Sequence, residues 1–140
     1  MIDIGFGRAE LVAIAPFAVV MIFAMGILLY ETFYPRNDRG SELPFWFSFL
    51  GLSIAGVLSL TGWHSDAAFG GTFALDGVAV FTNLICILSA ALSLMMAVHF
   101  MGLLGVRARE FHSLVLFAVG GMMIISSARD LIVLFLGIEL

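Results

Sequence analysis

The sequence predicts an all-α polytopic membrane protein with four transmembrane helices and the start of a fifth. Hydrophobic residues make up 62% of the 140 residues and charged residues only 11%, against about 45–50% and about 25% in an ordinary globular chain. The mean hydropathy is +1.15. The charged residues fall in clusters and leave long uncharged runs between them, which is the pattern of helices that cross a lipid bilayer.

The same composition excludes several other classes of protein. A single cysteine, Cys86, cannot build a secreted disulfide scaffold or hold an iron–sulfur cluster. The net charge of −4 makes nucleic-acid binding an unexpected function, and the high hydrophobicity excludes disorder. The sequence shows no phosphate-binding loop and no metal-ligand spacing. We therefore expect no redox catalysis by this chain alone, and no cofactor or metal bound by it.

Apolar runs define the predicted helices. Each of the first four is near or above the ~20 residues that cross ~30 Å of hydrocarbon at about 1.5 Å per residue. The fifth is too short to span by itself. We predict one transmembrane helical region over residues 1–140, with spans at 11–33, 43–62, 78–104 and 111–128 and a partial span at 131–140.

Prolines and aromatic residues mark the ends of the first two spans. Pro44 occupies a first-turn position, where proline is tolerated. Pro16 either opens the first helix or kinks a helix that begins near Ala9. Aromatic residues and Pro35 end that helix. The first run lacks a basic n-region, so we interpret it as a retained span and not as a cleaved signal peptide.

The arginines set the predicted orientation. Loops 31–42 and 105–110 each carry two arginines, and they share one side because two helices separate them. The opposite side carries Arg8 and Arg129. Arginines concentrate on the inner side of a membrane, so we expect both loops inside and the N-terminus outside.

Glu139 is the acid that this pattern singles out. If the last helix begins near Asp130, Glu139 lies roughly 14 Å along its axis, near the middle of the hydrocarbon. An ionisable residue there indicates a functional site. Loss of water disfavours the charged form of a carboxyl, and a carboxyl that can hold and release a proton suits a proton relay. The alternative is that the helix bends into the lipid–water interface, where Glu139 caps a helix end or forms an ion pair.

Three other polar residues are secondary candidates for a proton path. Arg129 and Asp130 form the turn before the last helix. The alternative to a functional role is an ordinary polar turn, in which the negative charge of Asp130 stabilises the N-terminus of that helix. His99 lies in the third span, where it either joins a proton path or packs as a polar residue.

Small residues in the third and fourth spans predict close helix packing. Four of them recur in the third span at spacings of four, three and four residues, and so share one helical face. Such a face usually marks helix packing in membranes, with a wet polar path as the alternative. Gly120 and Gly121 form a second predicted packing site. The face in the third span consists of Thr82, Cys86, Ser89 and Ser93.

Two segments together resemble a known family. The first is GGTFALDGVAVF, residues 70–81. The second covers residues 110–140 and ends in GMMIISSARDLIVLFLGIEL. They resemble subunit N of the proton-pumping NADH-quinone oxidoreductase, respiratory complex I. The resemblance covers essentially the whole chain, most strongly from Phe69 onward, and its most specific part is residues 121–140.

The resemblance implies a function and a site. Subunits of this family are antiporter-like parts of the membrane arm and take part in proton translocation coupled to quinone reduction. Each carries a fifth-helix glutamate near mid-membrane, paired with a lysine on a later broken helix, and that glutamate matches Glu139. The subunit does not itself bind NADH or flavin. NADH, FMN, iron–sulfur clusters and quinone belong to the parent complex, the partners are other membrane-arm subunits, and the expected location is a bacterial inner membrane.

The sequence also departs from the family. Family members are several times longer, and this chain has no lysine at all. We therefore expect an N-terminal fragment, a split subunit or a truncated reading frame. The family position before Asp130 is often asparagine, where this chain has Arg129. Two other functions stay open: a non-catalytic helical assembly module, and a part of a related cation/proton antiporter or membrane-bound hydrogenase.

Overall fold

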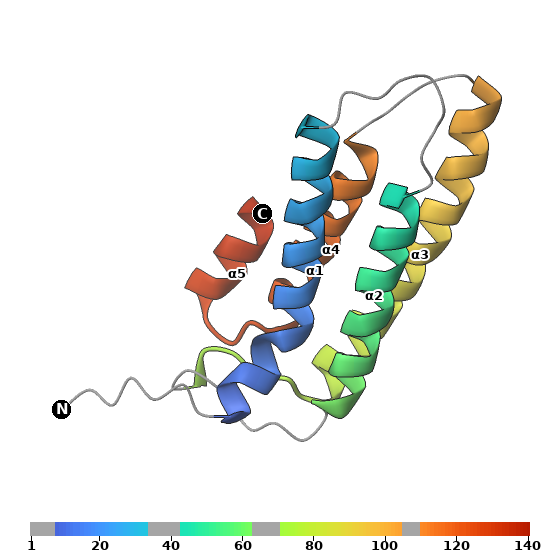
Figure 1. The fold of residues 1–140 in the computed structure, drawn as a ribbon. Coiled ribbons are helices and arrows are strands. Elements are labelled where there is room, and N and C mark those ends of the chain that lie inside the picture. Colours follow the sequence, from blue (N-terminus) through green and yellow to red (C-terminus); the bar gives the residue numbers. More distant parts are fainter. Residues whose placement is uncertain (1–7, 34–42, 63–70, 105–109) are drawn as a thin grey trace.

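The fold is a helical bundle in the computed structural model, which describes residues 8–33, 43–62, 71–104 and 110–140. Within these residues the ends of the helices differ from the ends of the predicted apolar runs by at most three residues. The five helices in this described part are α1 (Arg8–Phe33), α2 (Leu43–Thr61), α3 (Gly77–Leu104), α4 (Phe111–Ser127) and α5 (Leu131–Glu139) (Figure 1).

Helices α1 to α4 form an up-and-down bundle in which each helix runs opposite to the one before it (Figure 1). In this square arrangement α1 contacts α2 and α4, and α3 contacts the same two helices. Helix α5 turns back alongside α4. The end of α1 and the start of α2 therefore lie at the same end of the bundle as the end of α3 and the start of α4. The four loop arginines on which the predicted orientation depends lie outside the described residues.

Three of these helices are long and apolar enough to cross a membrane: residues 11–33 of α1, the whole of α2, and residues 77–101 of α3. Helix α4 is apolar but has only 17 residues, about 26 Å at 1.5 Å per residue and at the short limit for a span. The outward side chains are apolar as well. Ile22, Val78 and Met96, for example, are 69%, 73% and 75% exposed, as expected of helices that face lipid. The predicted all-α membrane fold is confirmed.

Pro16 lies inside α1, which begins at Arg8. Of the two interpretations left open for this proline, the structure therefore has the one in which the helix starts before it. The first turns of α1 are inclined to the rest of the helix (Figure 1). Such a bend is expected because a proline inside a helix removes one backbone hydrogen bond and clashes with the preceding turn.

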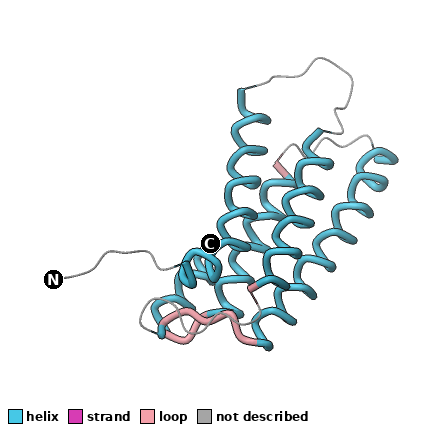
Figure 2. The backbone as a smooth tube through the Cα atoms, turned by 60° about the horizontal axis from the view of Figure 1, so that its bottom comes forward, coloured by secondary structure: helices cyan, strands magenta, loops and turns pink. Residues whose placement is uncertain are grey.

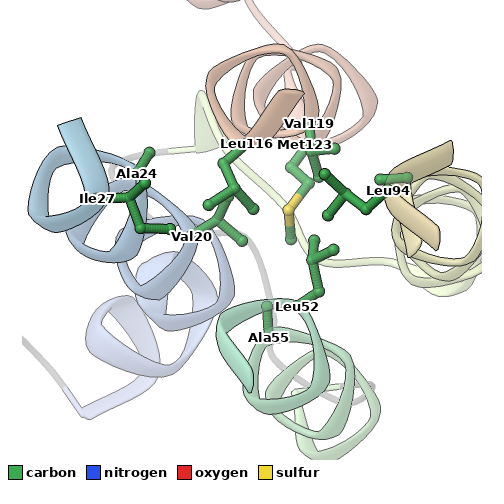
Figure 3. Close-up of a cluster of buried hydrophobic side chains, with 10 residues drawn as sticks. Val20, Ala24, Ile27, Leu52, Ala55, Leu94, Leu116, Val119 and Met123 are labelled. Carbon is green, nitrogen blue, oxygen red and sulfur yellow. The ribbon is translucent and has the colours of Figure 1, made fainter. Parts of the chain in front are cut away.

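The core of the bundle lies where α1 to α4 meet, and Figure 3 shows side chains from all four helices converging there. Its members are small or aliphatic, apart from one methionine, so the four helices can approach closely without leaving large voids. The buried members of this core are Val20, Ala24, Ile27, Leu52, Ala55, Ala90, Leu94, Leu116, Val119 and Met123.

The predicted glycine packing site in α4 is confirmed, and its two glycines serve different neighbours. A Cβ atom added at Gly120 would lie 2.9 Å from Sδ of Met21 in α1. A Cβ atom added at Gly121 would lie 2.8 Å from the carbonyl oxygen of Gly137 in α5. Both distances are shorter than ordinary contacts of a Cβ atom. The neighbour of Gly121 is backbone, so α4 and α5 can meet this closely because residue 121 is a glycine, whereas the neighbour of Gly120 is a flexible side chain that can shift.

The predicted small-residue face of α3 packs only in part. Sγ of Cys86 lies 3.9 Å from Sδ of Met122 in α4. Further along the helix, Ser89 and Ser93 are exposed, and their hydroxyls donate to carbonyl oxygens of α3 itself, at 2.9 and 2.8 Å. Helix packing therefore explains the first half of this face, while the second half faces outward.

Candidate functional site

The turn between α4 and α5 pairs with the segment just before α3. The backbone N–H of Ala74 donates to the carbonyl oxygen of Ser127, and the N–H of Arg129 donates to that of Thr72, each at 3.0 Å. These bonds flank an isolated antiparallel bridge. Figure 2 shows the two loops side by side at one end of the bundle. The two segments that carry the family resemblance are thus brought together in space.

Asp76 connects this turn to α3. Its Oδ1 accepts a hydrogen bond from the N–H of Ala79 at 2.8 Å, which satisfies one of the free N–H groups in the first turn of α3. Its Oδ2 lies 3.7 Å from Nη2 of Arg129, and both side chains are about half exposed (51% and 52%). One carboxylate therefore caps α3 and also pairs with the turn that leads into α5.

Asp130 stands at the N-cap position of α5, with extended backbone and no capping hydrogen bond from its side chain. Helix α5 therefore begins where the sequence analysis assumed. The predicted polar turn is present, and Arg129 in it has a specific partner, Asp76.

A polar pair with a buried asparagine lies close to this turn, and it was not among the predicted site residues. Oγ of Ser126 donates to Oδ1 of Asn83 at 2.7 Å, between α4 and α3, and the asparagine is only 1% exposed. A buried amide in an apolar bundle is stable only when it is hydrogen-bonded. Asn83 is the one amide side chain among the predicted apolar spans, and this was the signal that could have identified it.

Helix α5 meets α4 through two glycines, Gly121 and Gly137. A Cβ atom added at Gly137 would lie 2.7 Å from Cγ1 of Ile125 and 3.1 Å from the carbonyl oxygen of Gly121. One added at Gly121 would lie 3.8 Å from Cβ of Leu140. The last residues of α5 are therefore level with Gly121, which is six residues from the end of α4, or about 9 Å at 1.5 Å per residue.

Glu139 follows Gly137 by two residues, or about 200° around the helix, so its side chain leaves α5 on the side away from α4. It is exposed in the described chain. Its neighbours on α5, Phe135, Leu136 and Ile138, are apolar and 57–65% exposed. Within the described residues no basic side chain lies at ion-pair distance from its carboxylate. The chain thus presents an acid on an apolar outer surface, alongside the middle of α4 and not at its end.

His99 lies apart from the other candidates. It is exposed on α3, and its position is about 34 Å along the helix axis from Asp76, at 1.5 Å per residue. The structure therefore brings Arg129 to Asp76 and places both near the start of α5, but it does not bring His99 to them.

The chain is similar to a set of known bacterial proteins. NADH-quinone oxidoreductase subunit N of Rhodobacter capsulatus is 35% identical over 133 residues, which is 95% of this chain and 28% of the relative. The subunits of the same name from Trichlorobacter lovleyi and Desulfovibrio desulfuricans are 31% and 35% identical over 136 and 134 residues. They are matched over 28% and 26% of their own lengths.

This chain therefore spans just over a quarter of the length of the curated relatives that it matches. Neither a family model nor a solved structure matches it. The relatives nevertheless agree in name, and each covers well over nine-tenths of this chain. The resemblance predicted from the sequence is confirmed: nearly the whole chain is similar to a segment of NADH-quinone oxidoreductase subunit N.

Proposed function

We propose that this chain is part of a membrane-arm subunit of NADH-quinone oxidoreductase, where it takes part in proton translocation coupled to quinone reduction. Glu139 is the residue that carries the proton. The observation behind this assignment is its position: α5 turns back along α4, and the acid leaves α5 on an apolar face inside the length of the bundle. The similarity to subunit N over nearly the whole chain supports the choice of complex.

The proposed mechanism is electrostatic. In an apolar surrounding a carboxylate loses its hydration, so its proton affinity responds strongly to any charge brought near it. A positive charge close to Glu139 favours release of the proton, and removal of that charge favours uptake. NADH, FMN, iron–sulfur clusters and quinone serve the parent complex, and this chain contributes the protonatable group. Its partners in this proposal are other membrane-arm subunits and the lipid bilayer. The loops at 31–42 and 105–110 lie on the inner side of the membrane in this proposal.

The geometry favours Glu139 over the secondary candidates. Arg129 is engaged with Asp76, and its side chain is half exposed at the end of the bundle. Asp130 stands beside it at the start of α5. His99 is on the far part of α3. None of the three leaves its helix on the same apolar face as Glu139, so we assign them no step of proton transfer.

The test is the substitution Glu139→Gln in the full-length subunit within the assembled complex. The amide keeps the size of the side chain but cannot carry the proton, so the number of protons pumped per electron should fall while assembly is retained. Glu110→Gln is the matched control, because Glu110 is an exposed acid at the start of α4, at the end of that helix away from the turn into α5. An unchanged proton-to-electron ratio in Glu139→Gln would refute the role.

A helical assembly module is the second candidate, and the apolar outer surface of α5 favours it. Seven of its side chains, counting Leu140, are exposed and apolar: Leu131, Ile132, Leu134, Phe135, Leu136, Ile138 and Leu140. If assembly is the whole function, Glu139→Gln should pump normally, and polar substitutions on this surface should release the subunit from the complex. Gel filtration of the solubilised complex separates the two outcomes.

A further inference from the structure

We propose that residues 72–76 act as a clamp that fixes the start of α5 and thereby positions Glu139, with Asp76 and Arg129 as positioning residues. The clamp consists of the backbone bridge to residues 127–129 and the carboxylate of Asp76. This inference rests on the function proposed for Glu139. It adds residues of the loop before α3 to the machinery that sets where the proton is held.

Two contacts hold α5 against the rest of the described chain. The bridge fixes the chain two residues before α5 begins, since the N–H of Arg129 donates to the carbonyl oxygen of Thr72. The close contact of Gly121 with Gly137 fixes the helix again six residues after it begins. Two fixed points along the helix determine both its tilt and its axial position.

Two side chains of the clamp belong to a buried apolar cluster that also contacts α5. Phe73 and Leu75 are 8% and 1% exposed and form a buried cluster with Ala13 and Val80. Val133, from the first turn of α5, packs against the same cluster. The clamp residues thus contact α5 by side chains as well as by backbone hydrogen bonds, and they connect it to α1 and α3.

The clamp also determines the direction in which Glu139 points. Val133 and Gly137 are four residues apart and lie on one face of α5, and both are held against the bundle. The carboxylate of Glu139 is therefore held on the opposite face. A rotation of α5 about its axis, or a slip along α4, would move the carboxylate, and the contacts at the start of the helix oppose both movements.

Asp76 couples the two sides of the clamp, and its two roles can be separated by mutation. Asp76→Asn keeps a side-chain oxygen that can cap α3 but removes the charge that attracts Arg129. Asp76→Ala removes both. The ion pair is half exposed, so its loss alone should have a small effect, and Arg129→Gln should resemble Asp76→Asn. The alanine variant should have the larger effect.

The experiment measures the position of residue 139 without relying on proton transfer. In the full-length subunit within the assembled complex, Glu139→Cys is introduced together with Cys86→Ser, and the rate of alkylation by N-ethylmaleimide is measured. Adding Asp76→Ala should change this rate by about five-fold, the population shift that follows the loss of one helix cap. Asp76→Asn should change it less than two-fold. Glu110→Ala is the control, since Glu110 stands at the N-cap position of α4 without a capping bond.

A second measurement uses the native Glu139. Asp76→Ala should lower the number of protons pumped per electron and shift the pH profile of pumping, while Asp76→Asn restores most of both. Equal alkylation rates in Asp76→Ala and Glu110→Ala would overturn the clamp, even if Glu139→Gln abolishes pumping. Changed alkylation rates together with normal pumping in Glu139→Gln would support the clamp and refute the proton role, so the two failures are distinguishable.

Discussion

The contact between α4 and α5 can be tested by adding a single methyl group. Gly121→Ala places a Cβ atom 2.8 Å from the carbonyl oxygen of Gly137, which is a backbone atom that cannot rotate away. Gly137→Ala places one 2.7 Å from Cγ1 of Ile125 and 3.1 Å from the carbonyl oxygen of Gly121. In both variants α5 has to move away from α4, because ordinary contacts of this kind are longer.

The size of the effect follows from these distances. Reaching ordinary van der Waals contact requires a separation of roughly 0.6–1 Å, and overpacking of this kind costs about 1–3 kcal/mol of stability. Alanine in a helix recovers about 0.5–1 kcal/mol because glycine loses more backbone entropy on folding. We therefore expect a net destabilisation of about 0.5–2 kcal/mol, concentrated on α5, together with a displacement of Glu139.

The assay compares thermal unfolding of the purified complex and its proton-to-electron ratio across matched glycine variants. Gly26→Ala and Gly56→Ala are controls, since a Cβ atom at either position has no other atom within 4 Å, and helix propensity should leave these variants as stable as the parent or slightly more stable. Gly121→Ala and Gly137→Ala should unfold at lower temperature and pump fewer protons. If they match the two controls in both measurements, α5 is not held by this contact and the reasoning fails.

Two further predictions concern the end of the bundle near the clamp. Ser126→Ala leaves Oδ1 of the buried Asn83 without this hydrogen-bond donor and should destabilise the subunit by about 1–3 kcal/mol. Asn83→Leu should cost less, because the Ser126 hydroxyl can still donate to the carbonyl oxygen of Met123, at 2.9 Å. Thermal unfolding measures both, and a neutral Ser126→Ala would mean that the pair contributes nothing. Gly71→Ala places a side chain at φ +94°, where L residues are strained by about 1–2 kcal/mol; because a Cβ atom there has no other atom within 4 Å, a stability equal to that of the parent would contradict the assigned backbone strain.

The helices were predictable because their limits depend on local chemistry. Charges and helix-ending residues bound each apolar run, so the spans needed no knowledge of which helices meet. Pro16 shows the limit of local information, since its sequence context allows both a helix start and a kink, and the choice depends on the residues packed around it. The α4 glycines were also predictable as packing sites, although not the helix that each one meets.

The clamp was not predictable from the sequence by the same reasoning. It joins Thr72 to Arg129 and Asp76 to the same arginine, and residues more than fifty positions apart leave no periodic pattern in a single chain. Asn83 was missed for a related reason: a search for charged groups passes over an amide whose importance depends on Ser126 in another helix. Local patterns predict elements, whereas the site depends on how the elements pair.

The orientation of Glu139 constrains how a proton could be held there. On insertion scales, a charged side chain at the centre of a bilayer costs about 2.5–3.5 kcal/mol. In the function proposed for Glu139, another part of the assembly therefore has to bring a positive charge to this side chain and remove it again in each cycle. A fixed α5 would serve this proposed cycle, because the approaching charge would then meet Glu139 at the same depth and on the same face each time.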